Sequence, residues 1–191
     1  MTEQKDAALE YLLALSEEAA PEFLQQLPAE ELESLRGYVE HVVNLKTAGL
    51  DRLFESFSIV LKYIPNIVIY KLAPKYTEPS IAAQISEKLT VKQAVGLTSG
   101  FELDYLGEIT RYMNPQLAAT LMQEIKPALA DKLTIYAYQH FPLKGLDIAC
   151  HLPEKSLRRV AELVNPFELN DNLMSQSRQH VLDKLKQLRK T

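Results

Sequence analysis

The sequence PQLAATL at residues 115–121 follows an apolar-periodic stretch at residues 103–113, and this order recurs along the chain. The same phrase, in which a proline separates two apolar-periodic stretches, occurs at residues 67–85 and again from residue 143 through Pro153 to Ala161. Such a period is typical of helical-repeat arrays, because one helix pair cannot bury its own apolar face and must pack on its neighbours. The phrase therefore predicts an all-α fold, a right-handed superhelical stack of short antiparallel helix pairs.

Three segments follow from this pattern, and we expect them to form one compact domain. Residues 1–63 are predicted to be an N-terminal helical extension and cap, residues 64–165 the helical repeat core, and residues 166–191 a C-terminal capping helix. With 191 residues and 47% apolar content, the chain can build a continuous core.

Polar residues before the apolar stretches predict where helices begin. Thr90 and Ser99 each stand three residues before a Gln or Glu, which is the capping-box pattern. Asn114 and Asn165 each precede a proline, and proline is favoured in the first turn of a helix. The final helix is expected from about residue 170 to residue 189.

Residues 57–72 form the most apolar segment of the chain. Lys62, Pro65, Asn66 and Lys71 interrupt it, so it falls short of the roughly 18 apolar residues that indicate a membrane-spanning helix. We interpret the segment as core. Its β-branched and aromatic residues also allow a two-stranded hairpin that turns at Pro65, but the flanking pattern favours a helix with a proline break.

Composition and charge narrow the function classes. The net charge of −4 and the charged fraction of 24% are ordinary for a soluble protein and give no general attraction to nucleic acid. A single cysteine excludes an internal disulfide, and no secretion signal is evident, so we expect a reducing, cytoplasmic setting. Residues 1–40 are acidic and residues 155–191 basic, which indicates solvated capping helices or, alternatively, charge-steered docking.

The sequence LPEKSLRRVAEL at residues 152–163 resembles phrases in a known family of helical domains. It is similar to the superhelical N-terminal domain of MgtE-type magnesium transporters and to related helical repeats of flagellar motor-switch proteins, over about residues 60–165. The resemblance implies a stack of short helices. In the transporters this domain precedes nucleotide-binding-like modules and a membrane channel, and nothing here corresponds to either. The resemblance therefore implies a stand-alone cousin, and it transfers no functional residue.

Few residues suggest chemistry. Cys150 and His151 are adjacent, and neighbouring helical positions point about 100° apart, so they cannot share a proton directly. His41 or His140 could instead meet Cys150 in space. Asp104 and Glu108 share a helical face and could offer oxygens to a hard cation, although such carboxylates usually just face water. We therefore assign no catalytic, cofactor-binding or metal-binding residue, and expect no cofactor.

The tyrosines and the basic end are the remaining candidates for binding. Seven tyrosines lie in the central repeats, where they either pack at helix contacts or line a groove or an apolar pocket; they are Tyr63, Tyr70, Tyr76, Tyr105, Tyr112, Tyr136 and Tyr138. At the basic end, Arg158, Arg159 and Arg178 either complement helix dipoles or contact a partner.

We read the chain as a non-catalytic helical-repeat module that binds a protein partner. Arg158, Arg159, Tyr105 and Tyr112 are the candidate partner surface. The expectation includes no nucleic acid and no membrane span, and leaves homo-oligomer formation open. The alternative is a helical carrier of a small apolar, lipid-like ligand, suggested by residues 57–72 and the central tyrosines. An enzyme of unfamiliar type that uses Cys150 or a carboxylate is the third hypothesis.

Overall fold

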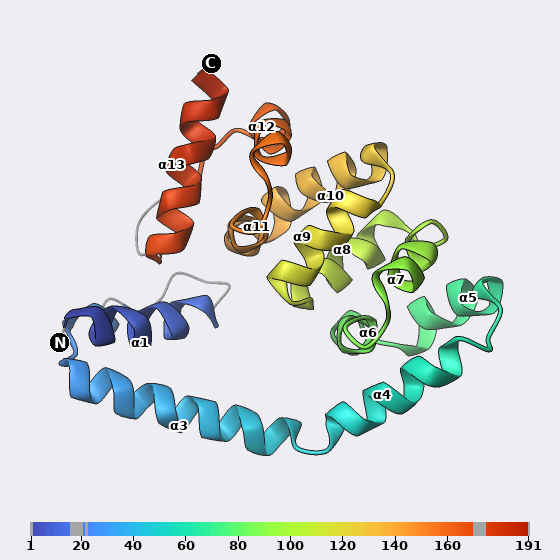
Figure 1. Cartoon of the computed structure of the whole chain (residues 1–191), viewed down its shortest axis with the longest axis horizontal. Helices are drawn as coiled ribbons and strands as arrows, with labels where there is room; N and C mark the ends of the chain where they lie inside the picture. Colours follow the sequence, from blue (N-terminus) through green and yellow to red (C-terminus); the bar gives the residue numbers. More distant parts are fainter. Residues whose placement is uncertain (1, 16–20, 22, 170–174, 191) are drawn as a thin grey trace.

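The fold is known from a computed structural model that describes residues 2–15, 21, 23–169 and 175–190. Thirteen helices and no strand occur in these residues, so the prediction of an all-α fold is confirmed (Figure 1). The helices are α1 (Thr2–Ala14), α2 (Phe23–Gln26), α3 (Ala29–Thr47), α4 (Leu50–Leu61), α5 (Asn66–Tyr76), α6 (Pro79–Ser86), α7 (Val91–Thr98), α8 (Leu103–Tyr112), α9 (Pro115–Glu124), α10 (Pro127–His140), α11 (Pro142–Ala149), α12 (Glu154–Leu163) and α13 (Gln176–Lys190).

The helices from α4 onward pack in two alternating rows. In one row α4 contacts α6, α6 contacts α8, α8 contacts α10, and α10 contacts α12. In the other row α7 contacts α9, α9 contacts α11, and α11 contacts α13. From α4 to α11, every helix except α5 therefore lies against the helix two positions along. The superhelical repeat arrangement and its right-handed sense stay predictions.

The repeating unit of this packing is shorter than the repeated phrase in the sequence. Helices α6, α8 and α10 begin at Pro79, Leu103 and Pro127, 24 residues apart. The phrase instead has its prolines at Pro79, Pro115 and Pro153, which belong to α6, α9 and the N-cap of α12. The copy at Pro115 thus falls in the other row from the copies at Pro79 and Pro153. The phrase marks where short helices begin and does not mark equivalent positions in the stack.

Two of the four predicted helix starts are confirmed. Thr90 forms a capping box with Gln93 at the start of α7, and the Asn114 side chain accepts hydrogen bonds from two backbone amides of α9. The prediction at Ser99 is wrong, because Ser99 lies at the end of α7 and Glu102 precedes α8.

The prediction that Asn165 begins a helix is also wrong. Its side chain accepts a hydrogen bond from the Phe167 amide and donates one to Glu168, so it closes a local turn. Side chains of this type often favour turns over helices. The last helix begins at Gln176, and residues 170–174, where the sequence predicted its start, lie outside the described residues.

The segment at residues 57–72 is helical, and the alternative of a strand hairpin is wrong. It forms the end of α4 and most of α5, with Pro65 at the N-cap of α5. The interpretation of this segment as core is also wrong. Ile69 is buried, but Phe57 and Ile67 are 50% and 63% exposed. Helix α5 stands at the edge of the stack in Figure 1, and no later helix covers its outer side.

The two ends of the described chain meet beside α11. The Glu10 carboxylate of α1 accepts hydrogen bonds from the backbone amides of Gln176 and Ser177, so an acidic side chain caps the first turn of α13. Arg178 is buried, and its guanidinium binds Asp147 of α11 and the Leu13 carbonyl of α1. The acidic and basic ends therefore contact each other within one chain.

Candidate functional site

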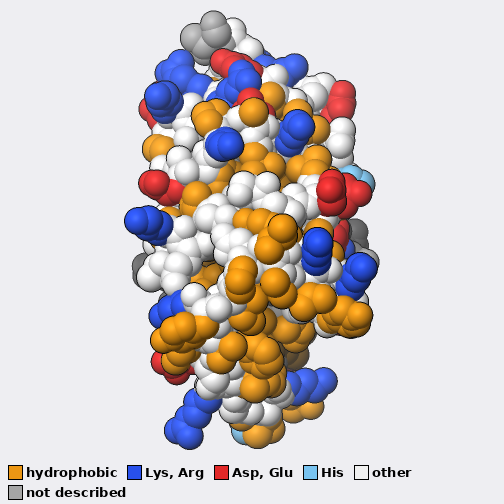
Figure 2. All heavy atoms as spheres, turned by 90° about the vertical axis from the view of Figure 1, so that its right-hand side faces the viewer, with side chains coloured by type: hydrophobic (Ala, Val, Ile, Leu, Met, Phe, Trp, Pro, Cys, Tyr) orange, Lys and Arg blue, Asp and Glu red, His pale blue; other side chains and the backbone are white. Residues whose placement is uncertain are grey.

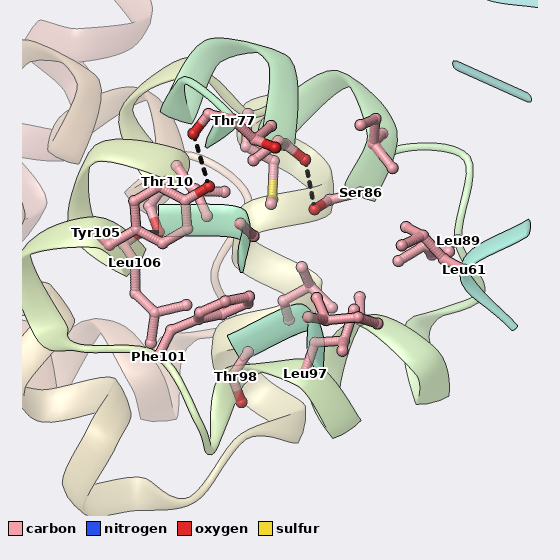
Figure 3. Close-up of a pocket in the computed structure, with 18 of the residues that line it drawn as sticks. Leu61, Thr77, Ser86, Leu89, Leu97, Thr98, Phe101, Tyr105, Leu106 and Thr110 are labelled. Carbon is pink, nitrogen blue, oxygen red and sulfur yellow. Dashed lines mark hydrogen bonds between the residues drawn. The ribbon is translucent and has the colours of Figure 1, made fainter. Parts of the chain in front are cut away.

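A cavity of about 380 Å³ lies between helices α4 to α9 at the α5 end of the stack (Figure 3). In the part of the chain that the structure describes, no side chain lining this cavity carries a charge. The lining residues are Phe57, Val60, Leu61, Ile64, Val68, Ile69, Leu72, Ala73, Tyr76, Thr77, Ala82, Ile85, Ser86, Leu89, Ala94, Leu97, Thr98, Phe101, Tyr105, Leu106, Ile109, Thr110, Met113, Ala118, Leu121, Met122, Ile125 and Leu133. The volume falls within the range of about 300–1,000 Å³ that is typical of small-molecule sites.

Helical periodicity explains why α4 and α5 present apolar walls to the cavity. In α5, Val68, Leu72 and Tyr76 follow one another at four-residue intervals and line it together. The inner helices contribute both small and bulky side chains to the lining, among them Ala94 and Leu106. The cavity wall is therefore apolar on the outer and on the inner helices.

Four hydroxyl groups in the cavity wall are already used within the protein. Tyr105 donates to the Thr77 carbonyl at 3.0 Å, and Ser86 donates to the Ala82 carbonyl of its own helix at 2.7 Å. The hydroxyls of the other two threonines in the helical wall donate in the same way to carbonyls three or four residues before them. Burial raises the pKa of Tyr105, so its phenol stays protonated as a donor. These hydroxyl protons are therefore not directed at a ligand.

Helix α5 is attached to the stack through one tyrosine. The Tyr70 hydroxyl donates to the Gly96 carbonyl of α7 at 3.0 Å, and its ring packs edge-on against Phe101 with centroids 5.3 Å apart. Gly100 makes this possible, because a Cβ atom at that position would overlap the Tyr70 ring. Phe101 in turn packs against Tyr105, so the attachment of α5 continues into the cavity wall.

Large apolar side chains surround the cavity on the outside of the molecule. Figure 2 shows hydrophobic side chains gathered over the lower half of the face where α4 to α7 lie. The exposed ones on α4, α5 and the turn between them are Leu50, Leu53, Phe57, Ile59, Val60, Tyr63, Ile67, Val68, Leu72 and Tyr76. Apolar patches of this kind on a soluble domain commonly mark binding sites.

The four residues that the sequence predicts to bind a partner lie in separate places in the structure. Tyr105 lines the cavity, and Tyr112 lies at the end of α8 with the Arg111 guanidinium over its ring. On α12, Arg158 pairs with Glu154 of the same helix at 2.8 Å.

Arg159 connects two helices of one row. Its guanidinium binds both carboxylate oxygens of Asp131 on α10, at 3.1 and 2.7 Å, and a third contact joins it to Glu162. The hydrogen bonds from Arg159 hold the pKa of the Asp131 carboxyl below its ordinary value. A role of these arginines in binding a partner stays a prediction.

The surroundings of Cys150, which was considered for catalysis, keep its thiol protonated. Cys150 is exposed, and its thiol donates to the Ser177 carbonyl at 3.6 Å. Neighbouring protein atoms raise its pKa to about 11 by desolvating the thiolate, and the Asp147 carboxylate adds to the effect. A protonated thiol is a weak nucleophile at neutral pH.

The carboxylates considered for metal binding differ in their surroundings. Asp104 is exposed at the start of α8, whereas Glu108 accepts a hydrogen bond from the Tyr136 hydroxyl at 3.2 Å and pairs with Arg111. Within the described ranges, no group of three or more His, Cys, Asp or Glu side chains is arranged to hold a metal ion. The structure of the described residues also contains no helix long and apolar enough to cross a membrane.

Comparisons with known proteins return no relative of this chain. No family model, curated protein or solved structure matches it. The resemblance to the magnesium-transporter domain therefore stays a hypothesis, and the function has to be argued from the cavity and the surface around it.

The cavity itself was not predicted from the sequence, but some of the residues that line it were noted as a possible site for an apolar ligand. The segment 57–72 and two of its lining tyrosines, Tyr76 and Tyr105, were the grounds for the alternative of an apolar-ligand carrier. The remaining lining residues come from α6 to α10, and no local pattern indicates that their side chains leave a common space.

Proposed function

We propose that this protein binds a small apolar molecule with an alkyl chain in the cavity between α4 and α9. The observation that carries the proposal is the lining: it contains no charged side chain among the described residues, and four of its hydroxyls donate to carbonyls of the protein itself. A polar ligand would lose hydrogen bonds to water and find few in return, at a cost of roughly 1–3 kcal/mol per group. An alkyl chain has no such cost.

The exposed position of α5 supports the same proposal. The cavity already reaches solvent beside α5, where the lining residues Val68, Leu72 and Tyr76 are exposed, and α5 itself has one buried residue, Ile69. Segments with few buried contacts open more readily than the core. Movement of α5 away from Phe101 would therefore widen the entrance for a ligand.

The protein-interaction module predicted from the sequence stays a second hypothesis. Its support is the stack itself, because arrays of helix pairs commonly present surfaces to other proteins. The cavity favours the small apolar ligand, since an apolar pocket of about 380 Å³ has the size of a small-molecule site.

Replacing Leu97 with Trp is expected to abolish ligand binding, because the larger side chain would occupy the cavity from α7. The neutral fluorescent probe N-phenyl-1-naphthylamine should bind wild-type protein with enhanced fluorescence, and Leu97→Trp should weaken its affinity at least about tenfold, or 1.4 kcal/mol. The matched control is Lys92→Trp, on the exposed side of the same helix, which should bind the probe like wild type. Equal binding by both variants would contradict the proposal.

The affinity of a straight-chain alcohol should increase with its length. Each methylene transferred from water into the cavity contributes about 0.8 kcal/mol, so each should lower the dissociation constant about fourfold until the cavity is full. The measurement is displacement of the same probe by a series of primary n-alkanols. A dissociation constant that does not change with chain length would show that the alkyl chain is not bound in an apolar space.

A further inference from the structure

The apolar surface around the cavity extends beyond what a bound ligand would cover. Ile59, Tyr63 and Ile67 do not line the cavity, yet they are 50%, 82% and 63% exposed. Filling the cavity with an alkyl chain would leave these three side chains in water. The surface that these three side chains form is therefore available to a second binding partner.

Two adjacent stripes of α5 differ in chemistry. Val68, Leu72 and Tyr76 face the cavity, whereas Ile67, Lys71 and Lys75 follow one another at four-residue intervals on a neighbouring stripe. All three members of this second stripe are exposed. The outer side of α5 is thus both apolar and positively charged.

The charges over this part of the chain have one sign. Residues 56–77 contain Lys62, Lys71 and Lys75 and no acidic residue, although the whole chain is acidic overall with a net charge of −4. Glu55 and Glu78 border the segment on either side. Two tyrosines, Tyr63 and Tyr76, stand at opposite ends of α5, both at least 80% exposed. Lysines and exposed aromatic rings next to apolar side chains are typical of elements that lie in a membrane interface.

We propose that the surface formed by the end of α4 and by α5, residues 57–76, docks onto the surface of a membrane that contains anionic lipids. The apolar side chains enter the boundary between headgroups and acyl chains, and the three lysines contact the negatively charged headgroups. The cavity then opens toward the lipid, so its ligand is an acyl chain taken from or delivered to the membrane. This ligand assignment rests on the proposed function, whereas docking itself does not.

Charge makes a membrane a better occupant than a second copy of the chain. In a symmetric dimer the same patch of both subunits would meet, which would bring Lys62, Lys71 and Lys75 of one copy close to those of the other. Like charges at a buried interface oppose association. An anionic lipid surface instead covers the apolar side chains and neutralises the lysines together.

Sedimentation with lipid vesicles tests the docking surface. Wild-type protein should bind vesicles of phosphatidylcholine mixed with phosphatidylglycerol and should not bind vesicles of phosphatidylcholine alone. Each lysine close to an anionic surface contributes roughly a fivefold factor, so the triple variant Lys62→Glu, Lys71→Glu, Lys75→Glu should bind at least about tenfold more weakly. The control is Lys126→Glu, Lys132→Glu, Lys155→Glu, an identical charge change at exposed positions of the other helices, and it should bind within about twofold of wild type.

Tryptophan fluorescence gives a second readout, because the chain contains no tryptophan. The variant Ile67→Trp should shift its emission to shorter wavelength on addition of the anionic vesicles and should be quenched by brominated acyl chains. Tyr112→Trp, on α8 outside this surface, should show neither change. Emission of the Ile67→Trp variant that vesicles leave unchanged would overturn the inference even if the charge variants failed to fold.

The outcomes separate this inference from the proposed function. If wild-type protein binds the naphthylamine probe but does not bind anionic vesicles, the docking surface alone is overturned. If it binds anionic vesicles but does not bind the probe, the cavity ligand alone is overturned. Equal binding to both kinds of vesicle overturns the role of the lysines. A wild-type dimer that becomes monomeric in Ile67→Asp, together with no vesicle binding, would assign the surface to a second copy and overturn the inference.

Discussion

Replacing Arg178 with Met is expected to lower the free energy of unfolding by about 3–5 kcal/mol. Arg178 is 2% exposed, and its Nε and Nη2 atoms donate to the two carboxylate oxygens of Asp147 at 2.7 and 2.8 Å. Methionine fills a similar volume but leaves the Asp147 carboxylate without its cation in a largely enclosed position. Urea denaturation followed by circular dichroism measures the change.

Arg158→Met is the matched control for Arg178→Met. Arg158 pairs with Glu154 at 2.8 Å, but both side chains are more than half exposed, and such pairs contribute about 0–1 kcal/mol. The double variant Arg178→Met, Asp147→Leu should recover much of the lost stability, because no unpaired charge remains buried. Equal effects of Arg178→Met and Arg158→Met would show that burial of the Asp147 pair does not matter.

Arg178→Met should also loosen α1. The Arg178 Nη1 atom donates to the Leu13 carbonyl at 3.1 Å, so the same side chain attaches the end of α1 to the C-terminal part of the stack. Amide hydrogen exchange in α1 should therefore accelerate more than exchange in α8, which packs between α6 and α10 in the middle of the stack.

Gly107→Ala is expected to destabilise the protein by about 1–3 kcal/mol, although Ala is the better helix former. A Cβ atom at Gly107 would overlap the Tyr136 ring, which lies against α8 and whose hydroxyl donates to Glu108. The ring would have to move and lose this hydrogen bond. Thermal denaturation and the near-ultraviolet signal of the tyrosines measure the effect.

Gly96→Ala is expected to have the opposite effect on stability. Gly96 also lies inside a helix, but no atom stands within 4 Å of the position its Cβ would take. The substitution should therefore stabilise the protein by up to about 1 kcal/mol through helix propensity alone. If both glycine variants changed stability in the same direction, contact with Tyr136 would not explain the choice of Gly107.

Features decided by neighbours in the sequence could be predicted well. The capping box at Thr90 and the cap at Asn114 involve residues only a few positions apart. The mistakes at Ser99 and Asn165 show the limit of such signals. Helix α8 begins after Glu102 without a side-chain cap, and the Asn165 side chain closes a turn and does not start a helix.

Features decided by distant residues could not be predicted. The apolar segment 57–72 looks like core in the sequence, since hydrophobicity alone does not show whether another helix covers it. Arg178 looked like one more cation of a basic end, but it is buried against Asp147, 31 residues away in the sequence. The cavity likewise depends on residues of α4 to α10, which are far apart in the sequence.

The contact between Glu10 and the first turn of α13 has a consequence for how the chain is made. Gln176 and Ser177 follow Glu10 by 166 and 167 positions in the sequence. Helix α1 therefore leaves the ribosome long before the segment that it caps has been translated. Contacts this distant in sequence form late, because the intervening chain must first be brought together. During synthesis, α1 can pack on α3, its main neighbour in the structure, well before the last helix is made.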